Sequence, residues 1–98
     1  METIKEILAG TTPVLIDFFA EWCAPCKAMR PTLDNLKREY GEKVRIIKID
    51  IDKNSTIARS CNIQSVPTLI LYKNGQSVWR ASGARPLSEL KEVIDRFI

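Results

Sequence analysis

The chain has 98 residues, of which 45% are hydrophobic and 28% are charged, so residues 1–98 have the length and composition of one globular domain. Its 15 Lys and Arg residues against 12 Asp and Glu residues leave a net charge of +3 without a basic tail, which argues against nucleic acid as a partner. With no histidine and three cysteines, the chain cannot build a Ser-His-Asp or Cys-His catalytic arrangement, an imidazole metal ligand or a four-thiolate metal site.

The first part of the chain predicts a helix, a strand and a second helix. Apolar residues recur at helical spacing over residues 3–9, before Gly10 and Pro13 end the pattern. Residues 14–20 are an almost continuous apolar run, which is typical of a strand covered on both faces at the centre of a sheet. Apolar side chains then follow one face over residues 24–40, so we expect a long helix there.

Two residues shape this long helix, and a second strand follows it. Pro31 lies inside the helix and has no N–H for the carbonyl of Lys27, so we expect a kink at this position. Gly41 stands where the end of a helix favours a left-handed residue. Residues 44–51 are rich in β-branched side chains and nearly all apolar, which predicts a second buried strand and hence a parallel, right-handed β-α-β unit.

A short helix and a third strand come next. Asn54 is a candidate N-cap for a helix that ends near Cys61. Residues 66–72 predict a strand that the chain enters through Pro67. We interpret Cys61 as a small buried apolar residue, and the alternative is a regulatory or dimer-forming thiol.

The last part of the chain predicts a hairpin and a final helix. Asn74 and Gly75 form a strong two-residue turn signal, so we expect residues 77–82 to pair back antiparallel on the third strand. Pro86 opens the final helix, whose apolar face recurs over residues 87–97. The order of the elements predicts an α/β fold with a mixed four-stranded sheet between helices.

Two expectations concern location. The longest apolar runs span a few residues, far below the roughly 18 that a membrane-spanning helix needs, so we expect no membrane segment. The first six residues include acidic side chains and no continuous apolar region, unlike an export signal, so we expect the protein in the cytoplasm.

Cys23 and Cys26 carry the chemistry that the sequence predicts. They stand between the first predicted strand and the long helix, and a Cys-x-x-Cys pair next to a β-α-β pattern is typical of a redox-active dithiol rather than half of a metal site. At this spacing in the first helical turn, both sulfurs lie on one face and can close a disulfide. Cys23 lies at the helix N-terminus among N–H groups without helical partners, so we expect its pKa to be lowered towards neutrality, unlike that of Cys26.

Further motifs accompany this pair in a defined order. They are the residues around the pair (15–27), Pro31, Val66-Pro67-Thr68, Lys73-Asn74-Gly75 and Gly83 before the last helix. In order and spacing, these motifs resemble the thioredoxin family over nearly the whole chain. The resemblance implies the thioredoxin fold, with a mixed four-stranded sheet flanked by about four helices, and a protein disulfide reductase. It implies no metal, and no cofactor other than the redox-active Cys23–Cys26 disulfide.

The resemblance also implies roles for the residues of the site. Cys23 is the exposed nucleophile that forms a mixed disulfide with a substrate protein, and Cys26 is the resolving thiol. Pro67 corresponds to the family's cis-proline beside the active site, where the backbone of Val66 is expected to pair with an extended substrate peptide. The alternative for Pro67 is an ordinary trans proline at the start of a strand.

Further residues are implied at the substrate-docking surface and between the cysteines. Trp22 would cover the dithiol and, with Gly83 and Ala84, help to form the docking surface. The alternative for Trp22 is a partly buried interface aromatic without a redox role. Ala24 and Pro25 tune the reduction potential, and Ala24 replaces the glycine that is usual in the family.

Asp17 is a carboxylate in the middle of an apolar strand, where burial raises the pKa of a carboxyl group. By the resemblance, Asp17 accepts the proton of Cys26 during resolution, and Lys48 on the neighbouring strand moderates the pKa of Asp17. A structural ion pair between Asp17 and Lys48 is the alternative.

The beginning of the chain departs from the family pattern. It lies near the point where the family's first helix begins, so we expect the usual first edge strand to be missing. The strand over residues 44–51 would then be an edge, which Arg45 and Lys48 protect against unwanted pairing.

The leading interpretation is a general electron carrier that reduces disulfides in other proteins and is recharged by a thioredoxin-reductase-type donor. We expect it to act as a monomer. One alternative is a protein-folding oxidase or isomerase, but these usually carry a histidine between their cysteines, where this chain has Ala24 and Pro25. The other alternative is a non-catalytic binding module with the same fold.

Overall fold

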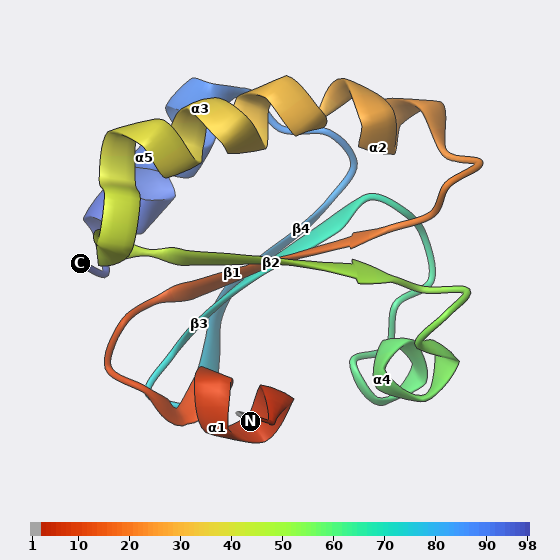
Figure 1. Cartoon of the computed structure of the whole chain (residues 1–98), viewed down its shortest axis with the longest axis horizontal. Helices are drawn as coiled ribbons and strands as arrows, with labels where there is room; N and C mark the ends of the chain where they lie inside the picture. The colour runs from red at the N-terminus through yellow and green to blue at the C-terminus, as the bar shows by residue number, and fades with distance from the viewer. Residues whose placement is uncertain (1–2) are drawn as a thin grey trace.

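A four-stranded sheet between two layers of helices makes up the computed structural model of the chain, which describes residues 3–98 (Figure 1). The expectation about an export signal falls partly on Met1 and Glu2, which lie outside the described residues. Within residues 3–98, no helix has both the length and the apolar character that crossing a membrane requires.

The helices and strands follow the order expected from the sequence. In chain order they are α1 (Ile4–Ala9), β1 (Val14–Phe19), α2 (Ala24–Ala28), α3 (Arg30–Tyr40), the 3-10 helix η1 (Gly41–Lys43), β2 (Arg45–Asp50), α4 (Ser55–Ser60), β3 (Thr68–Lys73), β4 (Gln76–Ser82) and α5 (Leu87–Asp95). This is the predicted α/β arrangement.

β1 lies inside the sheet, whose strand order is β2-β1-β3-β4. It pairs parallel with β2 and antiparallel with β3, and β3 forms an antiparallel hairpin with β4. Residues 14–18 are all buried, so the prediction of a central, fully covered strand is confirmed. β2 is at the edge, as expected, and its first three residues are only half-buried because one side of the strand has no neighbour.

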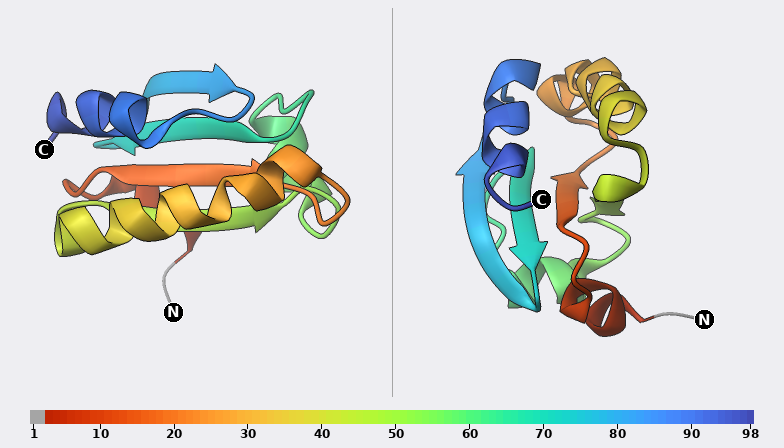
Figure 2. Two further views of the ribbon diagram at one scale, coloured as in Figure 1. Left: turned by 90° about the horizontal axis from the view of Figure 1, so that it is seen from above. Right: turned by 90° about the vertical axis from the view of Figure 1, so that its left-hand side faces the viewer.

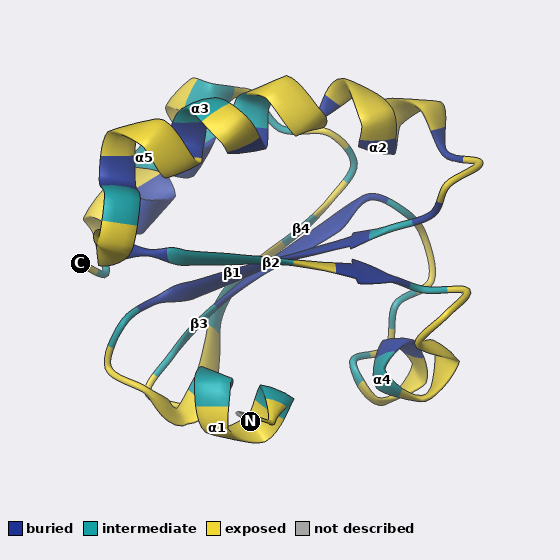
Figure 3. Ribbon diagram, viewed as in Figure 1, coloured by how far each residue is buried: buried dark blue, intermediate teal, exposed yellow. Residues whose placement is uncertain are grey.

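Helices α2, α3 and α5 cover one face of the sheet, and α1 and α4 cover the other (Figures 1 and 2). Alternate residues of β1 serve the two faces: Leu15 packs in the core cluster with α3 and α5, whereas Ile16 and Phe18 pack in the cluster with α1 and α4. The helices turn buried residues inward and exposed residues outward (Figure 3). Asp17 therefore lies on the α2 and α3 side of the sheet, like Leu15.

The long helix predicted over residues 24–40 is divided into α2 and α3 at Met29. The interruption lies close to the predicted kink, but Pro31 is in the first turn of α3 rather than inside one continuous helix. The first turn tolerates proline because its N–H groups have no helical partner. Gly41 ends α3 with a φ of 56°, as predicted, and η1 after it was not expected from the sequence.

Other element boundaries differ slightly from the predictions. β3 begins at Thr68, so Pro67 precedes the strand instead of lying within it. Asn54 occupies the N-cap position of α4, but its side-chain amide donates to the carbonyl of Asp50 at 3.0 Å, because this acceptor at the end of β2 lies within its reach. Pro86 is the N-cap of α5 rather than its first residue.

Candidate active site

Cys23 and Cys26 form a disulfide where the chain leaves β1 and enters α2. Their Cα atoms are 5.3 Å apart, within the usual range for a disulfide. Cys23 is the N-cap residue of α2, and its Sγ accepts a hydrogen bond from the backbone N–H of Cys26 at 3.2 Å. The bond that the spacing permits is therefore present, and a backbone donor points at the sulfur of Cys23.

Both cysteines are buried, so the expectation of an exposed Cys23 is wrong for this disulfide form. Cys23 is 4% exposed and Cys26 is 3% exposed. Apolar neighbours cause this burial, namely Ala20 in the same cluster and the partly buried Phe19, Ile51 and Val66. Ala24 and Pro25, between the two cysteines, are exposed, which places the disulfide directly beneath the surface.

The peptide bond between Val66 and Pro67 is cis, as the resemblance implied. Val66 packs against the cysteine cluster, and the carbonyl of Pro67 accepts a hydrogen bond from the N–H of Gly83 at 2.8 Å. Gly83 has a φ of 91°, which residues with a side chain rarely adopt. The fold thus brings the segments before β3 and after β4 together beside the dithiol, with Ala84 exposed next to them.

Trp22 lies on the surface, 70% exposed, immediately before the first cysteine of the pair. Its Nε1 donates a hydrogen bond to Oδ2 of Asp52 at 2.9 Å. The backbone N–H of Asp52 in turn donates to the carboxylate of Asp50 at 2.9 Å. The loop after β2 therefore holds the indole by its polar edge and leaves a large apolar surface open to a partner.

A cavity of about 200 Å³ lies next to the disulfide, on the α2 and α3 side of the sheet. It is lined by Asp17, Phe19, Cys26, Arg30 and Lys48. The predicted site residues Asp17, Cys26 and Lys48 therefore line one cavity together with Arg30, which was not predicted.

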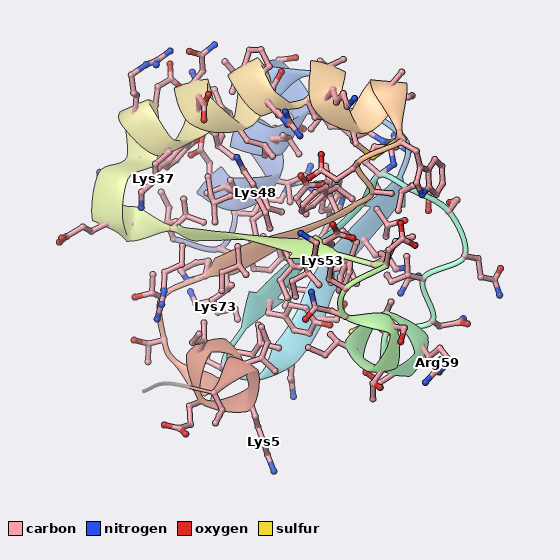
Figure 4. All side chains as sticks on the ribbon, turned by 45° about the vertical axis from the view of Figure 1, so that its right-hand side comes forward. Lys5, Lys37, Lys48, Lys53, Arg59 and Lys73 are labelled. Atoms are coloured by element: carbon pink, nitrogen blue, oxygen red, sulfur yellow. A yellow bond between two sulfur atoms is a disulfide. The ribbon has the colours of Figure 1, made fainter. Side chains whose placement is uncertain are left out.

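Asp17 is 3% exposed, and its burial raises its pKa from 3.8 to about 6 although Lys48 and Arg30 act in the opposite direction. Its Oδ1 has no hydrogen-bond partner among residues 3–98. Lys48 is opposite Asp17 in the pairing of β1 with β2 and rises from β2 towards α2 and α3 (Figure 4). The two side chains form no ion pair in the part of the chain that the structure describes, so the structural ion pair considered as an alternative is not formed.

The protein-family model described as Thioredoxin matches residues 2–96. Thioredoxin C-2 of Corynebacterium nephridii is 44% identical over 93 residues, which cover 95% of this chain and 86% of that relative. Thioredoxin 1 of Synechococcus elongatus is 36% identical over 94 residues, which cover 96% of this chain and 88% of that relative. The solved structure of mitochondrial thioredoxin 3 from Saccharomyces cerevisiae, in its oxidised form, has a TM-score of 0.85 and 35% identity, and the match covers 94% of this chain and 85% of that one. The chain belongs to the thioredoxin family.

Membership of the thioredoxin family confirms the predicted fold and chemistry. The chain is a dithiol-disulfide reductase, and Cys23 and Cys26 form its redox-active centre. Thioredoxins act on disulfide substrates, are reduced by thioredoxin reductase and need no cofactor. Across residues 3–98, the structure brings no three potential metal ligands together.

Sequence reasoning missed Arg30 and Asp52. Arg30 follows Cys26 by four residues, a spacing that brings two side chains onto one face of a helix, so a signal for Arg30 is available in the sequence. Asp52 lies two residues after the end of β2, and the carboxyl ends of the parallel strands β1 and β2 lie at the same end of the sheet. Both residues could therefore have been placed near the dithiol once the β-α-β unit was recognised.

Proposed function

We propose that this thioredoxin-family chain is a general electron carrier that reduces disulfides in other proteins in two steps. The Cys23 thiolate attacks one sulfur of the substrate disulfide, forms a mixed disulfide and releases the first substrate thiolate. The Cys26 thiolate then attacks Sγ of Cys23, which closes the Cys23–Cys26 disulfide and releases the second substrate thiolate. Two electrons pass from the chain to the substrate in each cycle.

The disulfide at the N-terminus of α2 is the observation that carries this proposal. In the reduced chain, the N–H of Cys26 that now contacts Sγ of Cys23 would donate to a thiolate, which favours the charged nucleophile. Because α2 has only five residues, its dipole is small. The N–H of Cys26 therefore stabilises the thiolate more than the dipole of α2 does.

Asp17 is the proton acceptor of the second step in this proposal. The Cys26 thiol must lose its proton before it attacks, and the carboxyl of Asp17 lines the same cavity as Cys26. With a pKa of about 6, Asp17 is mostly ionised at pH 7 and still binds a proton more readily than an ordinary carboxylate. Lys48, in the same cavity, favours the charged carboxylate before the transfer.

The docking surface of this proposal lies around the dithiol, which is directly beneath the surface. It consists of Trp22, Val66, Pro67, Gly83 and Ala84. The backbone of Val66 would pair with an extended substrate segment in the manner of an added strand. The exposed indole of Trp22 would cover the dithiol and form part of the docking surface. Ala24 and Pro25, between the two cysteines, would tune the reduction potential.

The partners of this proposal are disulfide-containing proteins and a thioredoxin-reductase-type electron donor. We expect a single-domain monomer, because the charged side chains of Lys48 and Arg45 on the edge strand β2 oppose pairing with the sheet of another chain. A cytoplasmic location is consistent with this activity, because the cytoplasm is a reducing compartment in which the Cys23–Cys26 disulfide can be reduced again to the dithiol.

Reduction of insulin disulfides by purified variants tests the roles of the two cysteines. Cys23→Ser should abolish reduction because the nucleophile is lost, whereas Cys26→Ser should still attack and accumulate a mixed disulfide that mass spectrometry detects. Cys61→Ser is the matched control, because Cys61 is a free thiol packed on the opposite face of the sheet, and its rate should be unchanged. Insulin reduction by a Cys23→Ser/Cys26→Ser double variant at the rate of the unaltered chain would contradict the proposal, because neither redox-active thiol would be present.

A further inference from the structure

Arg30 brings a second positive charge to the cavity that Asp17 and Cys26 share. It is the first residue of α3, whereas the other cation, Lys48, comes from β2 (Figure 4). The two cations therefore approach the buried carboxyl from different layers of the fold. Both favour the charged form of the Asp17 carboxyl and so oppose the rise in its pKa that desolvation causes.

Glu21 pairs with Arg30 on the outer side of the cavity. A guanidinium nitrogen of Arg30 lies 3.5 Å from Oε2 of Glu21, and the two side chains are 51% and 64% exposed. A carboxylate at this distance offsets part of the positive charge that Arg30 presents to the cavity. Because water screens an exposed pair, the offset is partial.

The other groups around the buried carboxyl come from each element that packs against it. β3 places the apolar Leu69 directly opposite. On β2, Asp50 lies two residues beyond Lys48, and its carboxylate already accepts backbone N–H groups of the following loop. On α3, Asp34 lines a neighbouring hollow of about 220 Å³ together with Lys37 and Lys48. Two cations, Arg30 and Lys48, line the cavity among the described residues. Of these, Arg30 is the one whose charge the exposed carboxylate of Glu21 partly offsets.

We propose that Arg30 is a positioning residue for the resolving step, because it holds the carboxyl of Asp17 in the charged form that accepts a proton. Glu21 weakens this effect. The inference rests on the proposed role of Asp17 as the proton acceptor. In the step itself, the proton passes from Sγ of Cys26 to the carboxylate, the Cys26 thiolate attacks Sγ of Cys23, and the substrate sulfur leaves as a thiolate. Arg30 forms no bond in this step and acts through its charge.

Titration of the Asp17 carboxyl by carbon-13 NMR in the reduced protein tests the electrostatic effect. Arg30→Gln removes the charge, so the midpoint should rise by about 0.5 to 1 pH unit. Glu21→Gln should lower the midpoint by roughly 0.3 unit, because the exposed pair is screened, and it should have no effect in the Arg30→Gln background. Arg38→Gln is the matched control on the exposed side of α3 and should leave the midpoint unchanged.

Single-turnover reduction of a protein disulfide tests the kinetic effect, because it separates formation of the mixed disulfide from its resolution. Arg30→Gln should shift the pH midpoint of resolution upwards by the same amount as the NMR titration and leave formation unchanged. Asp17→Asn should slow resolution more than formation and remove this pH dependence.

The outcomes separate this inference from the proposed role of Asp17. If Asp17→Asn removes the pH dependence but Arg30→Gln shifts neither the titration nor the resolution, the inference about Arg30 is overturned and the role of Asp17 stands. Equal effects of Asp17→Asn on formation and resolution would overturn the proton-acceptor role and the inference with it. A shift of the NMR midpoint without a matching shift of resolution would overturn the inference alone.

Discussion

A carboxylate inside a buried strand changes how the free energy of unfolding depends on pH. Desolvation raises the pKa of Asp17 from 3.8 to about 6, although Lys48 and Arg30 oppose it. Because this pKa is higher in the folded chain than in the unfolded chain, the folded chain binds the proton more tightly. The free energy of unfolding therefore falls as the pH rises from about 4 to about 6, and it stays lower above this range.

Asp17→Asn should consequently stabilise the chain at pH 7. Asparagine does not ionise, so the variant avoids the cost of a buried charge, which is about 3 kcal/mol for a shift of about two pKa units. Well below pH 4 the carboxyl is protonated in both states, and the variant should gain little. Urea denaturation at the two pH values measures the difference, and an equal gain at both would contradict the electrostatic explanation.

Single residues differ in how far the sequence alone predicts their roles. Asp17 stands out because it is charged within an apolar run, so its burial and the rise in its pKa were predictable. The spacing of Arg30 from Cys26 places it near the dithiol, but its role does not stand out, because charged residues on helices are common and its effect on the Asp17 carboxyl depends on how α3 lies over β1. Asp52 is an ordinary loop carboxylate until the fold brings it within hydrogen-bonding distance of Trp22. Tertiary contacts therefore decide the roles of residues that fit the local pattern.

The β3–β4 hairpin shows how far local sequence determines an element. Asn74 and Gly75 have φ angles of 54° and 80°, as the predicted two-residue turn requires. Lys73 pairs with Gln76 across this turn. The N–H of Gly75 also donates to the carbonyl of Leu8 at 2.7 Å, so the turn is attached to α1. The sequence predicted the turn but not this attachment.

Gly75→Ala should lower the free energy of unfolding by about 1 kcal/mol, because the φ of 80° is disfavoured for a residue with a side chain. Gly10→Ala is the matched control. Gly10 has an ordinary φ of −69°, and an added Cβ would lie 3.5 Å from the carbonyl oxygen of Ile7. The control should keep its stability or gain up to about 1 kcal/mol, since alanine restricts the unfolded chain. Chemical denaturation measures both, and a similar loss in the control would show that backbone strain is not the cause.

The division between α2 and α3 shows where local prediction ends. Pro31 predicted a disturbance of the helix, and the chain is disturbed there. The apolar spacing continues across Met29, so it did not distinguish one kinked helix from two helices. The irregular register between Leu71 and Tyr72 has no signal in the strand sequences, because it arises from pairing with β4.

At the scale of the whole molecule, the active site is assembled by strand pairing. The dithiol follows β1, the cis bond of Pro67 precedes β3, and Gly83 follows β4. Periodicity predicted the strands, but no single segment specifies which strands are neighbours. The resemblance to the thioredoxin family supplied that information, because several distant motifs agree in order and spacing.

The disulfide also links the redox state of the site to the stability of the whole chain. Its cysteines are three residues apart, so it restricts the unfolded chain only locally, and the expected gain in the free energy of unfolding is about 2 kcal/mol. In a chain of 98 residues, this gain corresponds to a melting temperature about 10 °C higher for the oxidised form.

Thermal unfolding with and without a reductant measures this difference. A Cys23→Ser/Cys26→Ser double variant should melt at the same temperature in both conditions, whereas Cys61→Ser should respond like the unaltered chain because Cys61 is a free thiol. If the oxidised form is more stable, the folded chain holds its disulfide more strongly than the unfolded chain does, and folding then favours the second exchange step and the release of reduced substrate. Equal melting temperatures would mean that the fold favours neither redox state, so that the drive for release would have to come from the substrate thiols.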